Sequence, residues 1–333
     1  MLLTSLDAPG VPGGPLAWPD ARTMFENAFD LNLERRTKYL WRLALTRRVR
    51  GRLLGEIGGD TMAEALFRAQ PRAFYPLMNH LIDRRMGAQQ RLCTTLASLR
   101  VVSGSVGDQA NVRSLLTLGV TLLELTDRTR IVLSLNDVSF HEGLWQVGLI
   151  GEDGLRLYSI GFGLTDARTL LMGNVQGPSS KDEGLDRIRD ATHAAHGMRP
   201  PHLLVHTLRV LAARWGTTRL VGVDPENHVK GRWNLRDSRL RFDYRGFWGE
   251  HEGVRDASGN WSLPLDTALR PLEDVPTKRR AMYRRRYAML EALQLAVDTL
   301  ADARHAAPPA SGISPEQVDD AANASTLEPV LVA

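Results

Sequence analysis

The sequence predicts an α+β protein, in which a helical N-terminal region is followed by a mixed, mostly antiparallel sheet and a long C-terminal helix. Three stretches support this prediction. Residues 19–125 carry apolar residues mainly at helical spacing, residues 131–177 hold short β-branched and aromatic runs between turn residues, and residues 277–305 return to a helical period. The composition, with 43% hydrophobic and 24% charged residues, is that of an ordinary globular protein.

The expected organisation has four segments. Residues 1–18 are rich in Gly and Pro and are expected to be disordered, residues 19–125 form the helical region, residues 126–305 form an α+β domain, and residues 306–333 form a disordered tail. No signal-peptide pattern opens the chain, and no run approaches the roughly 18 apolar residues of a membrane span. We therefore expect a cytoplasmic protein without a transmembrane segment, either free or peripheral at the inner membrane.

Residues that form disulfides or bind metals are sparse. Cys93 is the only cysteine, which excludes an intrachain disulfide and a zinc site built on several cysteines. It takes an apolar position in a helical pattern, so we expect a buried thiol. His193 and His196 lie three residues apart on an expected helix and could hold zinc, but the H-E-x-x-H pattern is absent and no further ligand is evident. We therefore expect no metal site.

The clearest β signal lies in four evenly spaced runs, IVLSLNDVSF, GLWQVGLIG, GLRLYSIGFGLT and TLLMGNVQG. They predict an antiparallel meander, with GEDG at 151–154 as a tight hairpin. Two helical segments, 180–197 and 202–216, then lead to TTRLVGV, a strand reached through a helix and therefore expected to pair in parallel. Residues 239–253, RLRFDYRGFWGEHEG, could supply one more strand, and GNWSLPL a short extended piece.

This order of elements, and the stretch LLVHTLRVLAARWGTTRLVGVDPENHV in particular, resembles the middle of Gcn5-related N-acetyltransferase-like folds. In those folds neighbouring strands splay after the last meander strand, and the pantetheine chain of the acyl carrier lies in the gap. Backbone N–H groups at the following helix hold the pyrophosphate. The resemblance implies acyl-CoA or an acyl-carrier protein as donor. The Gly-rich phosphate loop of that superfamily is absent, because an additional helix is inserted after NVQGP.

A second resemblance rests on the motifs NVQGP, HGMRPPHLL, NHV, FDYRGFWGEHEG, WSLPL and KRRAMYRRRYAMLEAL. In this order, over residues 60–305, they resemble the VirK/YbjX family of bacterial proteins. Membership implies a cytoplasmic protein associated with virulence and with resistance to antimicrobial peptides, and it implies no particular activity.

The acetyltransferase resemblance places His228 near the splayed gap at the strand ends, and FDYRGFWGEHEG is the densest mixture of aromatic and ionisable residues in the chain. His228 could act as a general base, Tyr244 could protonate a leaving thiolate, and Glu250 or His251 could deprotonate an amine or hydroxyl. Phe247 and Trp248 would then wall an apolar pocket for an acyl chain. The alternative is structural: His228 turns the chain after its strand, and 239–253 is an edge strand with its aromatics on the core.

Candidate donor-binding residues are Gln176 and Gly177 at the end of the meander, Asn227 at the end of the next strand, and Arg199 before two prolines. Arg199 could position a phosphate or carboxylate, and it could equally cap carbonyl groups. Asn227 could equally bond to the local backbone. Six cations within nine residues form a further cluster: Lys278, Arg279, Arg280, Arg284, Arg285 and Arg286.

This basic cluster fits an anionic phospholipid, an acidic carrier protein or a phosphorylated glycolipid. Nucleic acid is not expected, because no recognised binding motif accompanies the cluster. The alternative is that these Arg residues pair with Asp and Glu elsewhere in the fold. The leading functional hypothesis is an acyltransferase-like enzyme acting on an envelope component at the inner membrane. Its rival is a non-catalytic accessory protein that binds an envelope or secretion partner.

Overall fold

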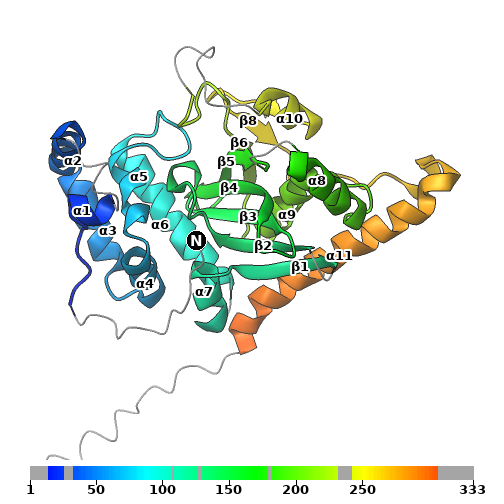
Figure 1. Cartoon of the computed structure of the whole chain (residues 1–333), viewed down its shortest axis with the longest axis horizontal. Coiled ribbons are helices and arrows are strands. Elements are labelled where there is room, and N and C mark those ends of the chain that lie inside the picture. The colour runs from blue at the N-terminus through cyan, green and yellow to red at the C-terminus, as the bar shows by residue number, and fades with distance from the viewer. Residues whose placement is uncertain are drawn as a thin grey trace, which may run out of the picture.

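A computed structural model describes residues 14–25, 33–106, 109–126, 129–178, 182–231 and 242–306 (Figure 1). The α+β architecture is confirmed: helices at the N-terminal end, a central eight-stranded sheet and a long C-terminal helix. The first helices are α1 (Ala21–Met24), α2 (Leu33–Leu45), α3 (Arg47–Ile57), α4 (Thr61–Ala69), α5 (Tyr75–Met78), α6 (Ala88–Ser105) and α7 (Gln109–Leu116). Most of segments 1–18 and 306–333 lies outside the described residues. Trp18 is described, and its ring centroid lies 4.5 Å from that of Phe74.

The first five strands form the predicted antiparallel meander. They are β1 (Val120–Thr126), β2 (Thr129–Leu135), β3 (Trp145–Ile150), β4 (Arg156–Asp166) and β5 (Thr169–Gln176). The turn at 151–154 joins β3 to β4 as expected. The sheet begins earlier than the sequence indicates, because β1 lies almost wholly inside the segment expected to be helical. Its register with β2 contains two shifts, which weaken the alternation that marks a strand.

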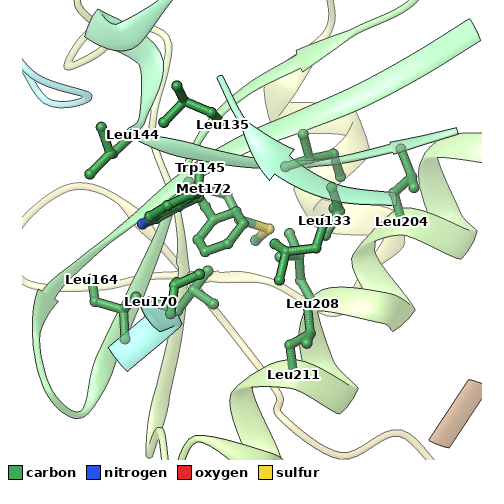
Figure 2. Packing of buried hydrophobic residues seen from close by; sticks show 14 of the residues in the cluster. Leu133, Leu135, Leu144, Trp145, Leu164, Leu170, Met172, Leu204, Leu208 and Leu211 are labelled. Carbon is green, nitrogen blue, oxygen red and sulfur yellow. The ribbon is translucent and has the colours of Figure 1, made fainter. Parts of the chain in front are cut away.

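The parallel strand is also confirmed. Helices α8 (Asp182–Ala194) and α9 (Pro200–Arg214) carry the chain to β6 (Arg219–Gly222), which pairs in parallel with β5 from Thr169–Arg219 to Met172–Gly222. The sheet then continues through β8 (Trp261–Leu263) to β7 (Val254–Arg255). Leucines of α9 pack against the sheet interior around Trp145 and Met172 (Figure 2). This packing buries the crossover helix and fixes the end of β6.

The prediction of a strand at 239–253 is wrong for the part that the structure describes. Tyr244–Glu250 is a helix, α10, and Asp243 caps it by accepting a hydrogen bond from Gly246 N at 3.0 Å. Tyr244, Phe247 and Trp248 recur at helical spacing and are buried, so the aromatic face of α10 covers the sheet. Trp248 donates to Val223 O at 3.0 Å. It is therefore a core residue, and neither it nor Phe247 walls an open acyl pocket.

Cys93 corrects a second expectation. It lies on α6, where the nearby residues Leu92 and Leu96 are buried. The Cys93 side chain, however, turns outward and is exposed. One step along a helix rotates a side chain by about 100°, so an apolar position next to the buried stripe can still face water. The long C-terminal helix α11 (Thr277–Ala306) is confirmed and packs on α9 and β1. Within the described ranges, no helix is both long and apolar enough to cross a membrane.

Candidate functional site

The site lies where the pairing of β5 with β6 ends. The last bond of this pair runs from Val223 N to Met172 O at 3.1 Å, whereas β5 continues beside β4 to Gln176. The β4–β5 register shifts at this point, so that Gly173 is the extra residue of a β-bulge. A Cβ at Gly173 would come within 2.0 Å of Glu142 O, so only glycine fits this approach. The bulge places Asn174 and Val175 at the gap beyond β6.

Glu142 is the buried acid of the site. It ends a single 3-10 turn, Phe140–Glu142, between β2 and β3, and it is 2% exposed. One carboxylate oxygen, Oε2, accepts from Lys230 Nζ at 2.6 Å and from Asn174 Nδ2 at 3.3 Å. The other, Oε1, lies 3.4 Å from His228 Nε2. A carboxylate withdrawn from water needs such partners, because an unpaired buried charge is costly.

His228 is fully buried in the loop after β6. Its Nδ1 accepts from Lys230 N at 3.0 Å, so the proton of the neutral ring lies on Nε2, the nitrogen that faces Glu142. Burial lowers the pKa of His228 to about 4, although the carboxylate of Glu142 works in the opposite direction. The imidazole is therefore neutral at physiological pH. Its Nε2 lies beside the Glu142 carboxylate without forming a hydrogen bond.

A strained segment holds this loop in place. Residues 79–86 are expected to continue a helix, but they form turns and an isolated bridge from Asp83 to His228 in the loop. Ile82 adopts a φ of +49°, which is a rare conformation for a β-branched residue, and it is fully buried. Ile82 N donates to His141 O at 2.6 Å, and Val229 N donates to Ile82 O at 3.0 Å. Residues before α6 thus tie the turn that carries Glu142 to the loop that carries His228.

Tyr244 closes the gap from α10. Its hydroxyl accepts a hydrogen bond from Val175 N at 3.3 Å, and its ring centroid lies 5.6 Å from that of His228. Burial raises the pKa of Tyr244 well above its usual value, so the phenol stays protonated. The site therefore combines a buried carboxylate and a protonated phenol. It reaches the surface at Lys230, whose side chain is 44% exposed.

Glu250 and His251 do not join this group. They lie at the other end of α10, beside a pocket of about 310 Å³ between α9, α10 and α11. Glu250 pairs with Arg199 at 2.5 Å and with His202 at 3.0 Å, and the ring centroids of His202 and His251 are 4.6 Å apart. Burial and the neighbouring His202 lower the pKa of His251 to about 3. The four candidate catalytic residues thus fall into two pairs at opposite ends of one short helix.

The candidate donor-binding residues have mixed positions. Gln176 is exposed at the end of β5, and Gly177 lies against Tyr158, whose ring a Cβ would approach to 2.8 Å. The side chain of Asn227 donates to Asn260 Oδ1 at 3.0 Å and to Gly259 O at 3.3 Å, so this side chain bonds to a distant hairpin and not to the local backbone. Arg199 lies at the surface in its ion pair with Glu250.

The start of α9 offers little to a phosphate. Pro200 and Pro201 occupy its first turn and carry no N–H group. The next amides, those of His202 and Leu203, donate to Arg199 O at 3.0 and 3.1 Å. An anion at this helix N-terminus would therefore meet few free donors. The structure gives a physical reason to expect no ordinary pyrophosphate site here.

The basic cluster at the start of α11 divides in two. Arg280 donates to Val275 O at 3.0 Å, and Arg286 donates to His196 O at 2.8 Å and lies over the Tyr283 ring. The other four cations are exposed: Lys278, Arg279, Arg284 and Arg285. Among the residues that the structure describes, none of the six pairs with a carboxylate, so the alternative of internal ion pairing is not supported.

Three members of the site were missed in the sequence: Glu142, Asn174 and Lys230. Each had a weak signal. Glu142 precedes a glycine at the edge of an apolar strand, Asn174 interrupts the apolar run LLMGNV, and Lys230 follows NHV by one position. A polar residue inside an apolar strand indicates a buried partner. The partner itself could not be identified, because 88 residues separate Glu142 from Lys230.

Comparison with known proteins places the chain in a family. Residues 31–299 match the model of DUF535, described as a protein of unknown function. The chain belongs to the DUF535 family. The match contains both the Glu142 site and the pocket beside Glu250. It is consistent with the resemblance to the VirK/YbjX family, because YbjX of Escherichia coli is 32% identical over 154 residues.

Other relatives of this DUF535 chain extend over more of its length. An uncharacterized protein of Haemophilus influenzae is 31% identical over 248 residues, covering 74% of this chain and 84% of the relative. The YbjX match covers 45% of this chain and 46% of YbjX. Membrane protein LapB of Mannheimia haemolytica is 28% identical over 159 residues, covering 47% of this chain and 68% of LapB. No solved structure matches the chain.

Proposed function

We propose that this protein is an acyltransferase-like enzyme whose reaction takes place at the gap beyond β6. The observation that carries the proposal is the position of Tyr244. Its hydroxyl accepts a hydrogen bond from Val175 N, and its ring lies beside that of His228. An antiparallel meander, a crossover helix and a parallel strand lead to this gap, as in acetyltransferase-like folds, where the acyl carrier occupies the equivalent place. The N–H of Val175 is a donor that a carrier or acyl carbonyl could take over from Tyr244.

The residues of the site suggest definite roles. Glu142 accepts the proton of an acceptor amine or hydroxyl, which then attacks the acyl carbonyl. The C–S bond of the thioester breaks, the leaving thiolate takes the proton of Tyr244, and the proton held by Glu142 then restores the phenol. We assign proton acceptance to Glu142 in place of His228, because the Nδ1 lone pair of His228 is engaged by Lys230 N. His228 is then a positioning residue. Lys230 Nζ occupies the place that an acceptor amine would take against Glu142.

The donor that fits best is an acyl chain on an acidic carrier protein. Pro200 and Pro201 remove the amides that would hold the pyrophosphate of coenzyme A. The exposed cations of α11, by contrast, form a patch suited to an acidic protein surface. The pocket beside Glu250 and His251 is lined by Arg286, so it adjoins this patch. An envelope component at the inner membrane remains our proposed acceptor, and a link to virulence or antimicrobial-peptide resistance belongs to the same proposal.

The test is native mass spectrometry of the full chain with a panel of acyl-CoA and acyl-carrier-protein donors. We expect one acyl-carrier protein to bind stoichiometrically, and an Arg284→Gln/Arg285→Gln variant to bind it less. Tyr244→Phe and Glu142→Gln should still bind the donor but should release no free carrier when an acceptor is present. Tyr39→Phe is the matched control, because it removes a buried phenol that donates to Pro19 O among the N-terminal helices.

A second candidate function is a non-catalytic accessory protein that binds an envelope or secretion partner. It is favoured by the closed state of the site, in which Glu142, His228 and Tyr244 are each no more than 3% exposed. Such a protein would bind no donor in the panel, and Tyr244→Phe would alter stability alone. Absence of donor binding across the panel would therefore support the accessory role.

A further inference from the structure

The outward face of α2 has the composition of a membrane-binding surface. Starting from Leu33, the exposed residues follow at i+4, i+7, i+8, i+11 and i+12, which is one stripe of a helix. They are Thr37, Leu40, Trp41, Ala44 and Leu45. The four large apolar side chains of this stripe, Leu33, Leu40, Trp41 and Leu45, are between 62% and 80% exposed.

The inward face of the same helix is already packed. Tyr39 is 1% exposed and donates to Pro19 O, and Leu43 packs against the core. Arg42 also turns inward and donates a hydrogen bond to Tyr75 Oη at 2.7 Å. Helix α2 therefore has two apolar faces, of which the protein uses one. A contiguous exposed apolar stripe of this kind marks an interaction surface.

Charge indicates what covers the outward face. Residues 35–52 contain eight Arg or Lys residues and no acid, whereas the whole chain carries only +4, so the rest of the chain is net negative. Arg36, Arg47, Arg48 and Arg52 are exposed, and no carboxylate pairs with them in the part of the chain that the structure describes. Trp and Leu beside clustered Arg is the composition of helices that lie in the interface of anionic bilayers.

We propose that α2 docks this protein on an anionic lipid surface, with Leu40, Trp41 and Leu45 inserted below the headgroups and the arginines of α2 and α3 on the phosphates. This inference is independent of the acyl-transfer chemistry. It also differs from the basic cluster of α11, because α2 lies at one end of the longest axis and the start of α11 at the other (Figure 1). The two surfaces can therefore be tested separately.

The test is co-sedimentation of the full chain with vesicles of phosphatidylcholine alone and with vesicles that also contain phosphatidylglycerol. We expect binding only to the second. Trp41→Ser/Leu45→Ser and Arg48→Gln/Arg52→Gln should each weaken it by roughly tenfold or more. Leu118→Ser/Leu155→Ser is the matched control, since these leucines are 83% and 56% exposed but lie outside α2. It should bind like the unchanged protein.

A second measurement does not depend on loss of binding. Because Cys93 is the only cysteine, Cys93→Ser/Leu40→Cys carries a single environment-sensitive dye on α2. Its emission should shift to the blue when phosphatidylglycerol vesicles are added. Unchanged emission, equal binding to both vesicle types, or full binding by Trp41→Ser/Leu45→Ser would each overturn the proposal. If the unchanged protein is a dimer and Trp41→Ser/Leu45→Ser is a monomer, the outward face of α2 is instead a contact between two copies of the chain.

Discussion

His228 Nε2 lies 3.4 Å from Glu142 Oε1, and both side chains are almost entirely withdrawn from water. The two residues come from loops on either side of the sheet centre, and Ile82 links those loops through two backbone hydrogen bonds. A neutral imidazole beside a carboxylate that a partly exposed lysine neutralises is a low-cost way to bury the imidazole and the carboxylate together. The same arrangement makes stability depend on pH and on each partner.

The free energy of unfolding should decrease as the pH is lowered from 7 to 4. In the folded protein burial lowers the pKa of His228 and His206 to about 4 and that of His251 to about 3. The unfolded chain binds a proton on each ring below about pH 6.5, whereas the folded protein binds it only near the lowered pKa. Each neutral histidine therefore contributes to the free energy of unfolding above about pH 6.5, and this contribution is lost as the pH falls towards the folded-state pKa. For His228 alone it is on the order of 3 kcal/mol at full extent.

This prediction is checked by urea unfolding across that pH range. His228→Gln should reduce the slope of unfolding free energy against pH below 6.5, and His193→Gln, which changes an exposed histidine, should not. An unchanged slope in His228→Gln would mean that His228 is already protonated in the folded state.

Lys230 and Glu142 should be energetically coupled. Lys230→Met leaves a buried carboxylate with weaker partners, and because the lysine is partly exposed we expect a loss of about 1–2 kcal/mol. Adding Glu142→Gln removes the charge, so the double variant should be more stable than the sum of the single changes predicts. A double-mutant cycle by chemical denaturation measures this difference. Strict additivity would show that the 2.6 Å contact contributes nothing.

The contact of Gly222 with Trp248 should be sensitive to a single methyl group. A Cβ at Gly222 would meet the indole at 2.4 Å, so Gly222→Ala must displace α10 and should cost about 2 kcal/mol or more. Gly249→Ala, on the same helix with nothing within 4 Å of its Cβ, is the control and should be neutral or stabilising. Thermal unfolding of the two variants decides the point. Equal melting temperatures would contradict this close packing.

The thiol of Cys93 should react without denaturant. It is exposed on α6, so a maleimide should modify the folded protein to one equivalent at the rate of an accessible cysteine. Mass spectrometry of the folded and urea-unfolded protein measures this rate. Protection that disappears only in urea would restore the expectation of a buried thiol.

Much of the fold could be predicted from the sequence. The meander from β2 to β5, the crossover to the parallel strand β6 and the length of α11 all follow from local periodicity and turn residues, which act within a few positions of the chain. Local patterns failed where tertiary packing overrides them. Residues 244–250 are aromatic-rich and suit a strand, but Asp243 caps them and Trp248 fills the space over Gly222, so they form a helix.

The residues of the site also differ in whether local sequence patterns could predict their positions. Local patterns in the sequence place His228 in the polar loop after a strand, but they put Tyr244 inside a strand where the structure has the helix α10. That both residues lie close to Glu142 and Lys230, while Glu250 and His251 line another pocket, depends on contacts between distant segments of the chain. The physical reason is that a buried charge is specified by its partners, and those partners come from segments far apart in sequence, which a single sequence does not pair.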